Sequence, residues 1–210
     1  MTALPRRLFV TGTDTGVGKT VLCAMLLAAR GGRYWKPVQS GAREDSDSLA
    51  VARLSGRGPG CLLPEVYRLA APLSPHEAAR LEGVRIDPAR LGIPPLPAGE
   101  PLVVEGAGGA LVPLAPGLLT TDLMAALGLP VLVAARSGLG TINHTLLTLE
   151  ALRARGLDVA GVVLCGPLNP ANRRAIEEYG RVRVAGELEP LAALGPEALR
   201  AAWARGFRGC

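Results

Sequence analysis

The apolar residues of this chain fall into two kinds of segment that alternate along its length. Short, continuous apolar runs predict buried strands at 8–10, 34–38, 101–106, 130–135, 158–165 and 182–186. Segments with apolar residues at helical spacing cover 21–30, 48–54, 121–128, 145–156, 169–180 and 196–206. Because the two kinds alternate and most strands are apolar throughout, the pattern predicts an α/β fold with a mostly parallel, doubly wound sheet flanked by helices.

Two stretches interrupt the alternation, 56–75 and 84–99, and their many Gly and Pro residues predict irregular connections. Within the first, Ser74-Pro75 predicts the start of a short helix, which places His76 at a helix N-terminus in a structural role. Since no long linker divides the 210 residues, we expect one domain that spans the whole chain.

The first predicted strand leads into a glycine turn that ends in Lys19-Thr20, directly before the first helix. In a phosphate-binding loop, this arrangement points backbone N–H groups and the positive end of the helix dipole at an anion. We expect Lys19 to contact the outer phosphates and the Thr20 hydroxyl to ligate Mg²⁺. The pattern G-x-x-x-x-G-K-[ST] requires glycine at Thr13, but the glycine lies at Gly12. The alternative is a glycine-rich turn that only closes a β-α unit.

Several polar residues follow predicted strands, at the edge where open α/β sheets bind ligands. Lys36 and Ser40 lie at the C-terminal end of the second strand. Glu105 lies at the end of the strand 101–106 and precedes four small residues. We expect its carboxylate to hold Mg²⁺; the alternative is an acidic side chain in a turn, solvated by water. Asp45 and Asp47 come just before the helix 48–54, and for Asp47 the residues alone favour an N-cap over a metal ligand.

One loop offers a candidate site for a carboxylate. Gly140, Thr141 and Asn143 provide small residues and donors before the predicted helix 145–156, and helix N-termini bind anions. His144 is expected on the first turn of this helix.

Composition narrows the classes of function. The net charge of +5 comes from dispersed arginines without interleaved aromatic residues, which argues against nucleic-acid binding. No apolar run reaches the length of a membrane helix, and the N-terminus lacks a signal-peptide core. The cysteines form no C-x-x-C pair, which favours a reducing cytoplasm and disfavours a disulfide framework or a zinc site. They are Cys23, Cys61, Cys165 and Cys210.

Lysine is rare in this chain. It occurs only at Lys19 and Lys36, and the remaining Lys+Arg residues are arginine. Generic positive charge is therefore supplied as arginine. The two lysines mark positions that need a compact ammonium group in place of the planar guanidinium of arginine.

Taken together, the motifs resemble the dethiobiotin synthetase family of the phosphate-loop superfamily. The matching segments are VTGTDTGVGKT, YWKPVQSG, SDSLA, LSPH, VEGAGG, LGTINHTLLT and VAGEL. They extend over nearly the whole chain, and the family shares the shifted glycine.

The resemblance implies a cyclo-ligase of biotin biosynthesis that converts ATP, CO₂ (or bicarbonate) and 7,8-diaminopelargonate into dethiobiotin, ADP and phosphate. A substrate amine forms a carbamate, the carbamate attacks the γ-phosphate, and the second amine closes a cyclic urea. Such chemistry depends on positioning and on neutralising negative charge. The family also implies a C₂ homodimer with the substrate carboxylate site at the interface.

The resemblance also assigns roles to individual residues. Lys36, Lys19 and Thr15 would be catalytic, and Thr20, Asp47 and Glu105 would hold Mg²⁺, which reverses the N-cap interpretation of Asp47. The remaining nucleotide contacts would be Asp14, Gly16, Val17, Gly18, Val21, Gly106, Ala107, Gly108, Cys165 and Gly166. The substrate contacts would be Ser40, Gly140, Thr141, Ile142, Asn143 and His144.

One position departs from the family. Relatives often carry Asn-Asp where the base is read, and Cys165-Gly166 occupies that place here. Because a bidentate amide is missing, we expect weak base selectivity, or base contacts from the backbone of 186–191.

Two other classes share parts of the pattern. ATP-dependent amide ligases such as those of cobyrinate usually carry an additional glutaminase domain, for which 210 residues leave no room. Partition and septum-site ATPases usually carry a second lysine in the loop, where this chain has Asp14 or Thr15. They often end in a basic amphipathic helix, and the closing segment 198–209 is basic.

Overall fold

The computed structural model describes residues 3–42 and 46–207, so Asp45 and Cys210 lie outside the described residues. In this part of the chain, six parallel strands form a central sheet in the order β10-β9-β8-β1-β5-β2. Their bounds are β1 Arg7–Gly12, β2 Arg33–Trp35, β5 Leu102–Gly109, β8 Val131–Arg136, β9 Val159–Cys165 and β10 Val184–Leu188. The predicted doubly wound α/β fold is therefore confirmed.

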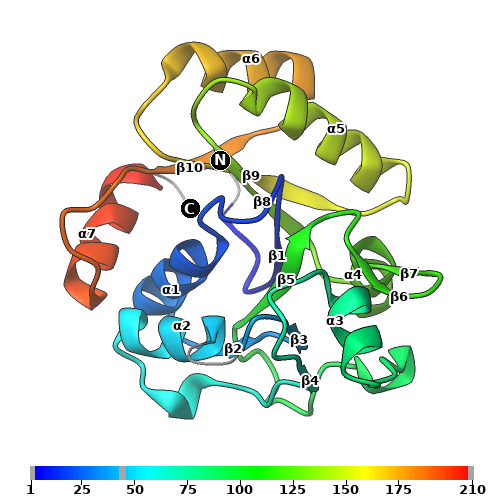
Figure 1. The fold of residues 1–210 in the computed structure, drawn as a ribbon. Helices are drawn as coiled ribbons and strands as arrows, with labels where there is room; N and C mark the ends of the chain where they lie inside the picture. The colour runs from blue at the N-terminus through cyan, green and yellow to red at the C-terminus, as the bar shows by residue number, and fades with distance from the viewer. Residues whose placement is uncertain (1–2, 43–45, 208–210) are drawn as a thin grey trace.

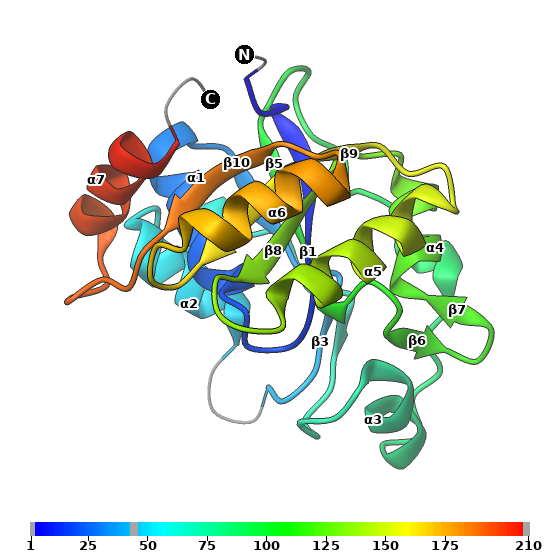
Figure 2. The ribbon, with the colours of Figure 1, turned by 90° about the horizontal axis from the view of Figure 1, so that it is seen from above.

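Helices cover both faces of the sheet (Figure 1). Their bounds are α1 Lys19–Arg30, α2 Asp47–Ser55, α3 Pro75–Leu81, α4 Thr120–Leu127, α5 Thr141–Arg153, α6 Pro170–Gly180 and α7 Pro196–Gly206. Side chains alternate across β1, so that Leu8 and Val10 pack in the core beneath α1 and α7, while Phe9 packs beneath α4, α5 and α6. Figure 2 shows α5 and α6 in front of the sheet, with α1 and α7 beyond it.

Short elements lie between the strands and helices of the main fold, and three of them (59–61, 67–68 and 88–90) fall in the stretches 56–75 and 84–99 that the sequence predicts as irregular. The short elements are β3 Val38–Gln39, β4 Tyr67–Arg68, β6 Pro113–Ala115, β7 Leu118–Leu119 and the 3₁₀ turns Pro59–Cys61 and Pro88–Arg90. β3 pairs with β4 and β6 with β7, as two small separate sheets. Helix α3 contacts β6, at the corner seen in Figure 2.

The predicted strand 34–38 is wrong in its extent. The central sheet keeps only Arg33–Trp35, and the chain then leaves it at Lys36 to form β3. Pro37 has no N–H to continue the ladder, and its carbonyl accepts instead from the N–H groups of Val66 and Tyr67. This departure turns the Lys36 side chain into the space at the end of the sheet.

Other boundaries also move. Helix α5 begins at Thr141 and ends at Arg153, so the predicted helix 145–156 starts too late and ends too late, while His144 does lie on the first turn. The final basic helix, α7, buries Leu199 and Ala202 in the core shared with α1. Its apolar face is therefore used within the fold. Among the described helices, none has both the length and the hydropathy needed to cross a bilayer.

Candidate nucleotide and catalytic site

The glycine turn after β1 leads directly into the N-terminus of α1. Gly16 and Gly18 have φ of 71° and 97°, the left-handed region that glycine adopts without strain. Gly18 is the N-cap of α1, and no side chain caps its first amides. The Lys19 ammonium folds back and donates to the carbonyl of Asp14 at 3.0 Å. The turn is thus a loop of backbone donors around the start of a helix, as a phosphate-binding loop requires.

The shifted glycine has a steric reason. A Cβ at Gly12 would lie 2.7 Å from the Asp14 carbonyl oxygen, 2.8 Å from Val17 Cγ2 and 2.9 Å from Lys19 Nζ. Two of these neighbours belong to the loop itself and the third is the loop's lysine. Glycine is needed at 12 because the loop closes over that position.

Four side chains from four parts of the chain meet beside this loop. Lys36 Nζ donates to Glu105 Oε1 at 3.1 Å and to Asp47 Oδ2. Thr20 Oγ1 lies 2.8 Å from Asp47 Oδ1 and 3.2 Å from Glu105 Oε1. Lys36 is 4% exposed and Glu105 1% exposed, so two charges are held away from water.

Strand register brings Lys36 and Glu105 together. β2 pairs with β5 through Tyr34↔Val103 and Trp35↔Val104, so the next position on each strand is Lys36 and Glu105. Because alternate residues of a strand share a face, both side chains point toward α1, which supplies Thr20.

The start of α2 supplies Asp47, and here the N-cap interpretation is wrong. Ser46 is the N-cap, because its hydroxyl accepts from the N–H of Leu49 at 3.3 Å. The N–H of Asp47 donates to Gln39 Oε1 at 3.2 Å. With the helix start satisfied by these two residues, the Asp47 carboxylate is available to Thr20 and Lys36.

The electrostatics of the cluster follow from burial and pairing. Burial lowers the pKa of Lys36, but Glu105 and Asp47 outweigh burial and raise the pKa of this ammonium above its usual value. Burial opposes ionisation of Asp47, yet Lys36 holds the pKa of its carboxyl below the usual range. For Lys19, burial prevails and lowers the pKa, against the opposing charge of Glu105. Glu105 and Asp47 therefore favour the cationic form of Lys36.

A cavity of about 930 Å³ opens over this cluster. Of the residues predicted for the site, it is lined by Thr15, Gly16, Gly18, Lys19, Thr20, Val21, Lys36, Ser40, Asp47, Glu105, Ala107 and Gly108. The Ser40 hydroxyl is buried and finds no hydrogen-bond partner in residues 3–42 and 46–207, so it is available to a ligand.

Other predicted residues do not line this cavity. Asp14 is exposed and pairs with Arg136, and Val17 is buried in the core beneath α1. A Cβ at Gly106 would meet the Phe9 ring at 2.8 Å, which gives this glycine a packing reason.

The predicted carboxylate segment is not brought to the cavity either. Gly140 is the left-handed N-cap of α5, and the Thr141 hydroxyl donates to the carbonyl of Arg136. Asn143 and His144 are exposed, Ile142 is half-buried, and none of the five residues 140–144 lines the cavity.

Cys165 ends β9 beside the glycine turn, and Gly166 follows it. A Cβ at Gly18 would lie 3.1 Å from Cys165 Sγ, so the thiol touches the loop. Gly166 has φ of 133°, and a Cβ there would lie 2.4 Å from Ser137 Oγ. In this structure, a side chain at 166 is therefore disfavoured by the backbone conformation and by the Ser137 hydroxyl.

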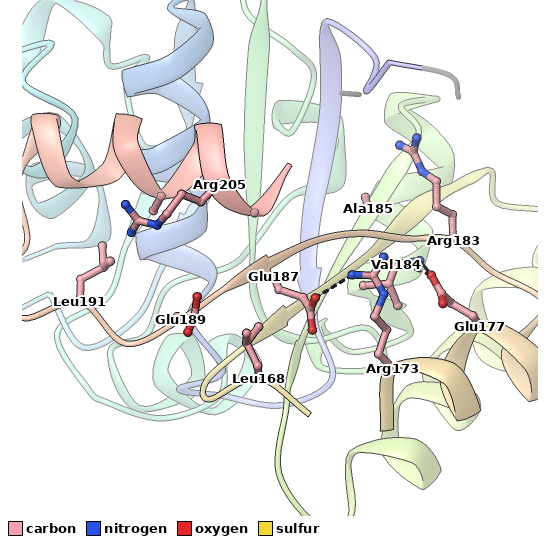
Figure 3. Close-up of a pocket in the computed structure, with 12 residues that line it drawn as sticks. Leu168, Arg173, Glu177, Arg183, Val184, Ala185, Glu187, Glu189, Leu191 and Arg205 are labelled. Carbon is pink, nitrogen blue, oxygen red and sulfur yellow. Dashed lines mark hydrogen bonds and ion pairs between the residues drawn. The ribbon is translucent and has the colours of Figure 1, made fainter. Parts of the chain in front are cut away.

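The segment 186–191, expected to supply backbone contacts to a base, borders a second cavity of about 540 Å³ (Figure 3). This cavity lies between α6, β10 and α7. Charged groups on its wall satisfy one another: Arg173 donates to Glu187 at 2.6 Å, and Glu177 accepts from the N–H of Val184 at 3.3 Å. No catalytic or metal-binding candidate lines it.

The sequence did not predict the residues that contact Lys36, Asp47 and Glu105 from the protein interior. The Tyr34 hydroxyl donates to Glu105 Oε2 at 2.9 Å, and the Cys23 thiol is buried nearby, where burial and the Glu105 carboxylate raise its pKa. Gln39 holds the backbone of Asp47. One signal was present for Tyr34, because it lies two residues before Lys36 and so shares its face of the strand.

The donor set at the centre fits Mg²⁺. Thr20, Asp47 and Glu105 converge as one hydroxyl and two carboxylates, and Mg²⁺ is usually bound by one or two carboxylates together with substrate phosphates and water. Across the described ranges, no group of three or more His, Cys, Asp or Glu forms a metal site by itself. A cation here would need phosphate ligands as well.

The parallel sheet, the glycine turn at a helix start and the strand-end acid define a phosphate-loop nucleotide-binding protein. A sequence family described as AAA domain matches residues 6–198. The chain is 54% identical to the ATP-dependent dethiobiotin synthetase BioD of Agrobacterium fabrum, over 96% of this chain and 94% of the relative. It is 53% identical to the protein of that name from Rhodopseudomonas palustris, over 95% and 93%. The chain belongs to the ATP-dependent dethiobiotin synthetase family.

Solved structures agree on the fold. The chain is similar to a ParA family ATPase from Chlorobium tepidum TLS, with a TM-score of 0.56 and 11% identity over 94% of this chain and 90% of that one. It is also similar to a putative plasmid partition protein from Borrelia burgdorferi B31, with a TM-score of 0.54 and 11% identity over 97% and 99%. At such identity the likeness concerns the fold alone.

Proposed function

We propose that this protein is an ATP-dependent dethiobiotin synthetase, a cyclo-ligase that makes dethiobiotin from 7,8-diaminopelargonate, CO₂ and ATP. The observation that carries the proposal is the buried Lys36 ammonium, held between Glu105 and Asp47 within reach of the phosphate-loop residue Thr20. Membership of the family supports the same activity.

The reaction has three steps. One substrate amine adds to CO₂ and loses a proton, which gives a carbamate. A carbamate oxygen then attacks the γ-phosphorus and ADP leaves, so a carbamic-phosphoric anhydride forms. The neighbouring amine attacks the carbonyl carbon, phosphate leaves, and the cyclic urea closes.

The side chains of this site supply charge and position for these steps. Lys19 and the loop amides would bind the β- and γ-phosphates, with Thr15 beside the reacting atoms. Lys36 would neutralise the carbamate and the phosphoryl group in transfer. Ser40 would hydrogen-bond the substrate through its free hydroxyl. Mg²⁺, held by Thr20, Asp47 and Glu105, would screen the phosphate charge.

The substrate carboxylate is proposed to bind at residues 140–144 of a second copy in a C₂ homodimer. The structure supports this in two respects: that segment does not line the cavity of its own subunit, and Leu139 beside it is fully exposed. An exposed leucine next to an exposed helix N-terminus is a surface suited to a partner subunit. We also propose a cytoplasmic location, in line with the free thiols of Cys23, Cys61 and Cys165.

The assignment is tested by substrate dependence. With Mg·ATP and bicarbonate, the purified protein is expected to release phosphate only when 7,8-diaminopelargonate is added, and mass spectrometry should detect dethiobiotin in equal amount. A diamine of similar length without vicinal amines serves as the control, because it cannot close a five-membered urea. Equal phosphate release without the diamine would contradict the ligase assignment.

Base selectivity is expected to be weak. A bidentate base contact is worth about 1–3 kcal/mol of discrimination, and Cys165-Gly166 at the end of β9 offers no side-chain amide. We therefore expect kcat/KM with GTP or CTP to lie within about tenfold of the value with ATP. Competition assays with the three nucleotides measure the ratio.

Cys165→Asn should raise the preference for ATP, whereas Cys61→Ser, a change at a thiol far from the loop, should leave it unaltered. A strong preference for ATP in the natural protein would show that backbone contacts suffice.

A further inference from the structure

Glu105 is a carboxylate with two distinct sides. Its Oε1 faces the site, where it accepts from Lys36 at 3.1 Å and lies 3.2 Å from the Thr20 hydroxyl. Its Oε2 faces into the protein, where the Tyr34 hydroxyl donates to it at 2.9 Å. The residue is 1% exposed, so both oxygens depend on protein partners.

Tyr34 is placed for this contact by the sheet. It lies on β2 opposite Val103, two residues before Lys36, while Glu105 lies two residues after Val103 on β5. Tyr34 and Lys36 therefore approach the same carboxylate from one face of adjacent strands. The Tyr34 ring is fully buried in the core beneath α1 and has no access to the cavity.

These contacts fix the plane of the Glu105 carboxylate, and with it the direction of the oxygen that faces the site. A carboxylate with only one fixed oxygen can rotate about its terminal bond, whereas one held on the far side cannot without leaving a buried donor and acceptor unpaired. We propose that Tyr34 is a positioning residue: its hydroxyl fixes Oε2 of Glu105 and thereby orients Oε1 toward the divalent cation that accompanies the nucleotide. Outer partners of metal ligands act in this way.

The inference rests on the proposed magnesium site, and the experiment is chosen to be independent of ligase turnover. Mn²⁺ stands in for Mg²⁺, and its binding is measured by electron paramagnetic resonance of free Mn²⁺ in the presence of ADP, without diamine. Tyr34→Phe is expected to weaken Mn²⁺ binding by about tenfold or more. ADP binding in EDTA should stay unchanged, because the Tyr34 hydroxyl donates to Glu105 and not to a residue of the phosphate loop.

The chain offers a matched control in Tyr67→Phe. The Tyr67 hydroxyl is also buried and accepts from the N–H of Asp87 at 2.8 Å, but it lies in the other core, away from the cavity. This variant loses a comparable hydrogen bond and should bind Mn²⁺ normally. Equal Mn²⁺ affinity in the two variants would overturn the proposal, whatever the outcome of the ligase assay.

A double-mutant cycle separates orientation from packing. Glu105→Gln weakens Mn²⁺ binding directly, and adding Tyr34→Phe to it should weaken binding no further, because the carboxylate that Tyr34 orients is gone. If Tyr34→Phe alone does not fold, the double variant is expected to fold, since the neutral amide tolerates the loss of the hydroxyl better than a buried carboxylate. Failure of both variants to fold, or additive losses in Mn²⁺ affinity, would assign Tyr34 to the core only.

Discussion

Lys36→Arg is expected to lower kcat about 100-fold or more while conserving the charge. The ammonium is 4% exposed and sits between two carboxylates that approach it from different elements. A guanidinium is longer, planar and fork-shaped, so it cannot place one compact charge at the same point. The reacting groups would then lose the cation aligned with them. Steady-state measurements with saturating diamine and ATP give kcat, and single-turnover measurements give the rate constant of the chemical step.

The control for this variant lies three residues earlier, at the start of β2. Arg33 pairs with Glu100 at 3.2 Å at the far end of β2, and Arg33→Lys should keep nearly full activity. Activity of Lys36→Arg equal to that of Arg33→Lys would remove the role given to the Lys36 ammonium. Circular dichroism should show that both variants are folded.

Gly12→Ala is expected to weaken nucleotide binding by up to about 100-fold, with a cost of about 1–3 kcal/mol from overpacking. The added methyl would meet the Asp14 carbonyl oxygen at 2.7 Å and Lys19 Nζ at 2.9 Å. Backbone within a closed loop cannot move aside without reorienting its neighbouring amides. Because those amides and Lys19 are the proposed phosphate donors, the change should appear in ADP affinity, measured by isothermal titration calorimetry.

The comparison variant is Gly92→Ala. A Cβ there meets nothing within 4 Å and requires no positive φ, so ADP affinity should be unaltered. If Gly12→Ala also binds ADP normally, the loop can adjust, and the close approach at position 12 is not the reason for glycine there.

The class of fold and the location of the phosphate loop could be predicted from the sequence. The alternation of apolar runs and helical patterns gave the parallel sheet, because strands buried on both faces have no polar positions. The position of Lys19-Thr20 between a strand and a helix indicated the phosphate loop, since motif and local structure coincide within a few residues. The strand-end position of Glu105 likewise pointed to the ligand edge.

Contacts between distant segments could not be read in this way. From local pattern alone, Asp47 is an N-cap, and only the folded chain shows that Ser46 caps the helix while Asp47 meets Lys36 and Thr20. The second strand was predicted too long, because a pattern of apolar residues does not reveal where a chain changes sheets. The close packing that demands glycine at 12 and 166 is likewise invisible in the sequence.

By itself, the sequence determined the class of fold, the phosphate loop and the identity of the charged residues, since each depends on neighbours along the chain. The tertiary structure decided their partners. It set Glu105 between Lys36 and Tyr34, because the β2–β5 register brings together side chains about 70 residues apart. It also left residues 140–144 outside the cavity. Local periodicity carries no information about such register, so only the assembled sheet could supply it.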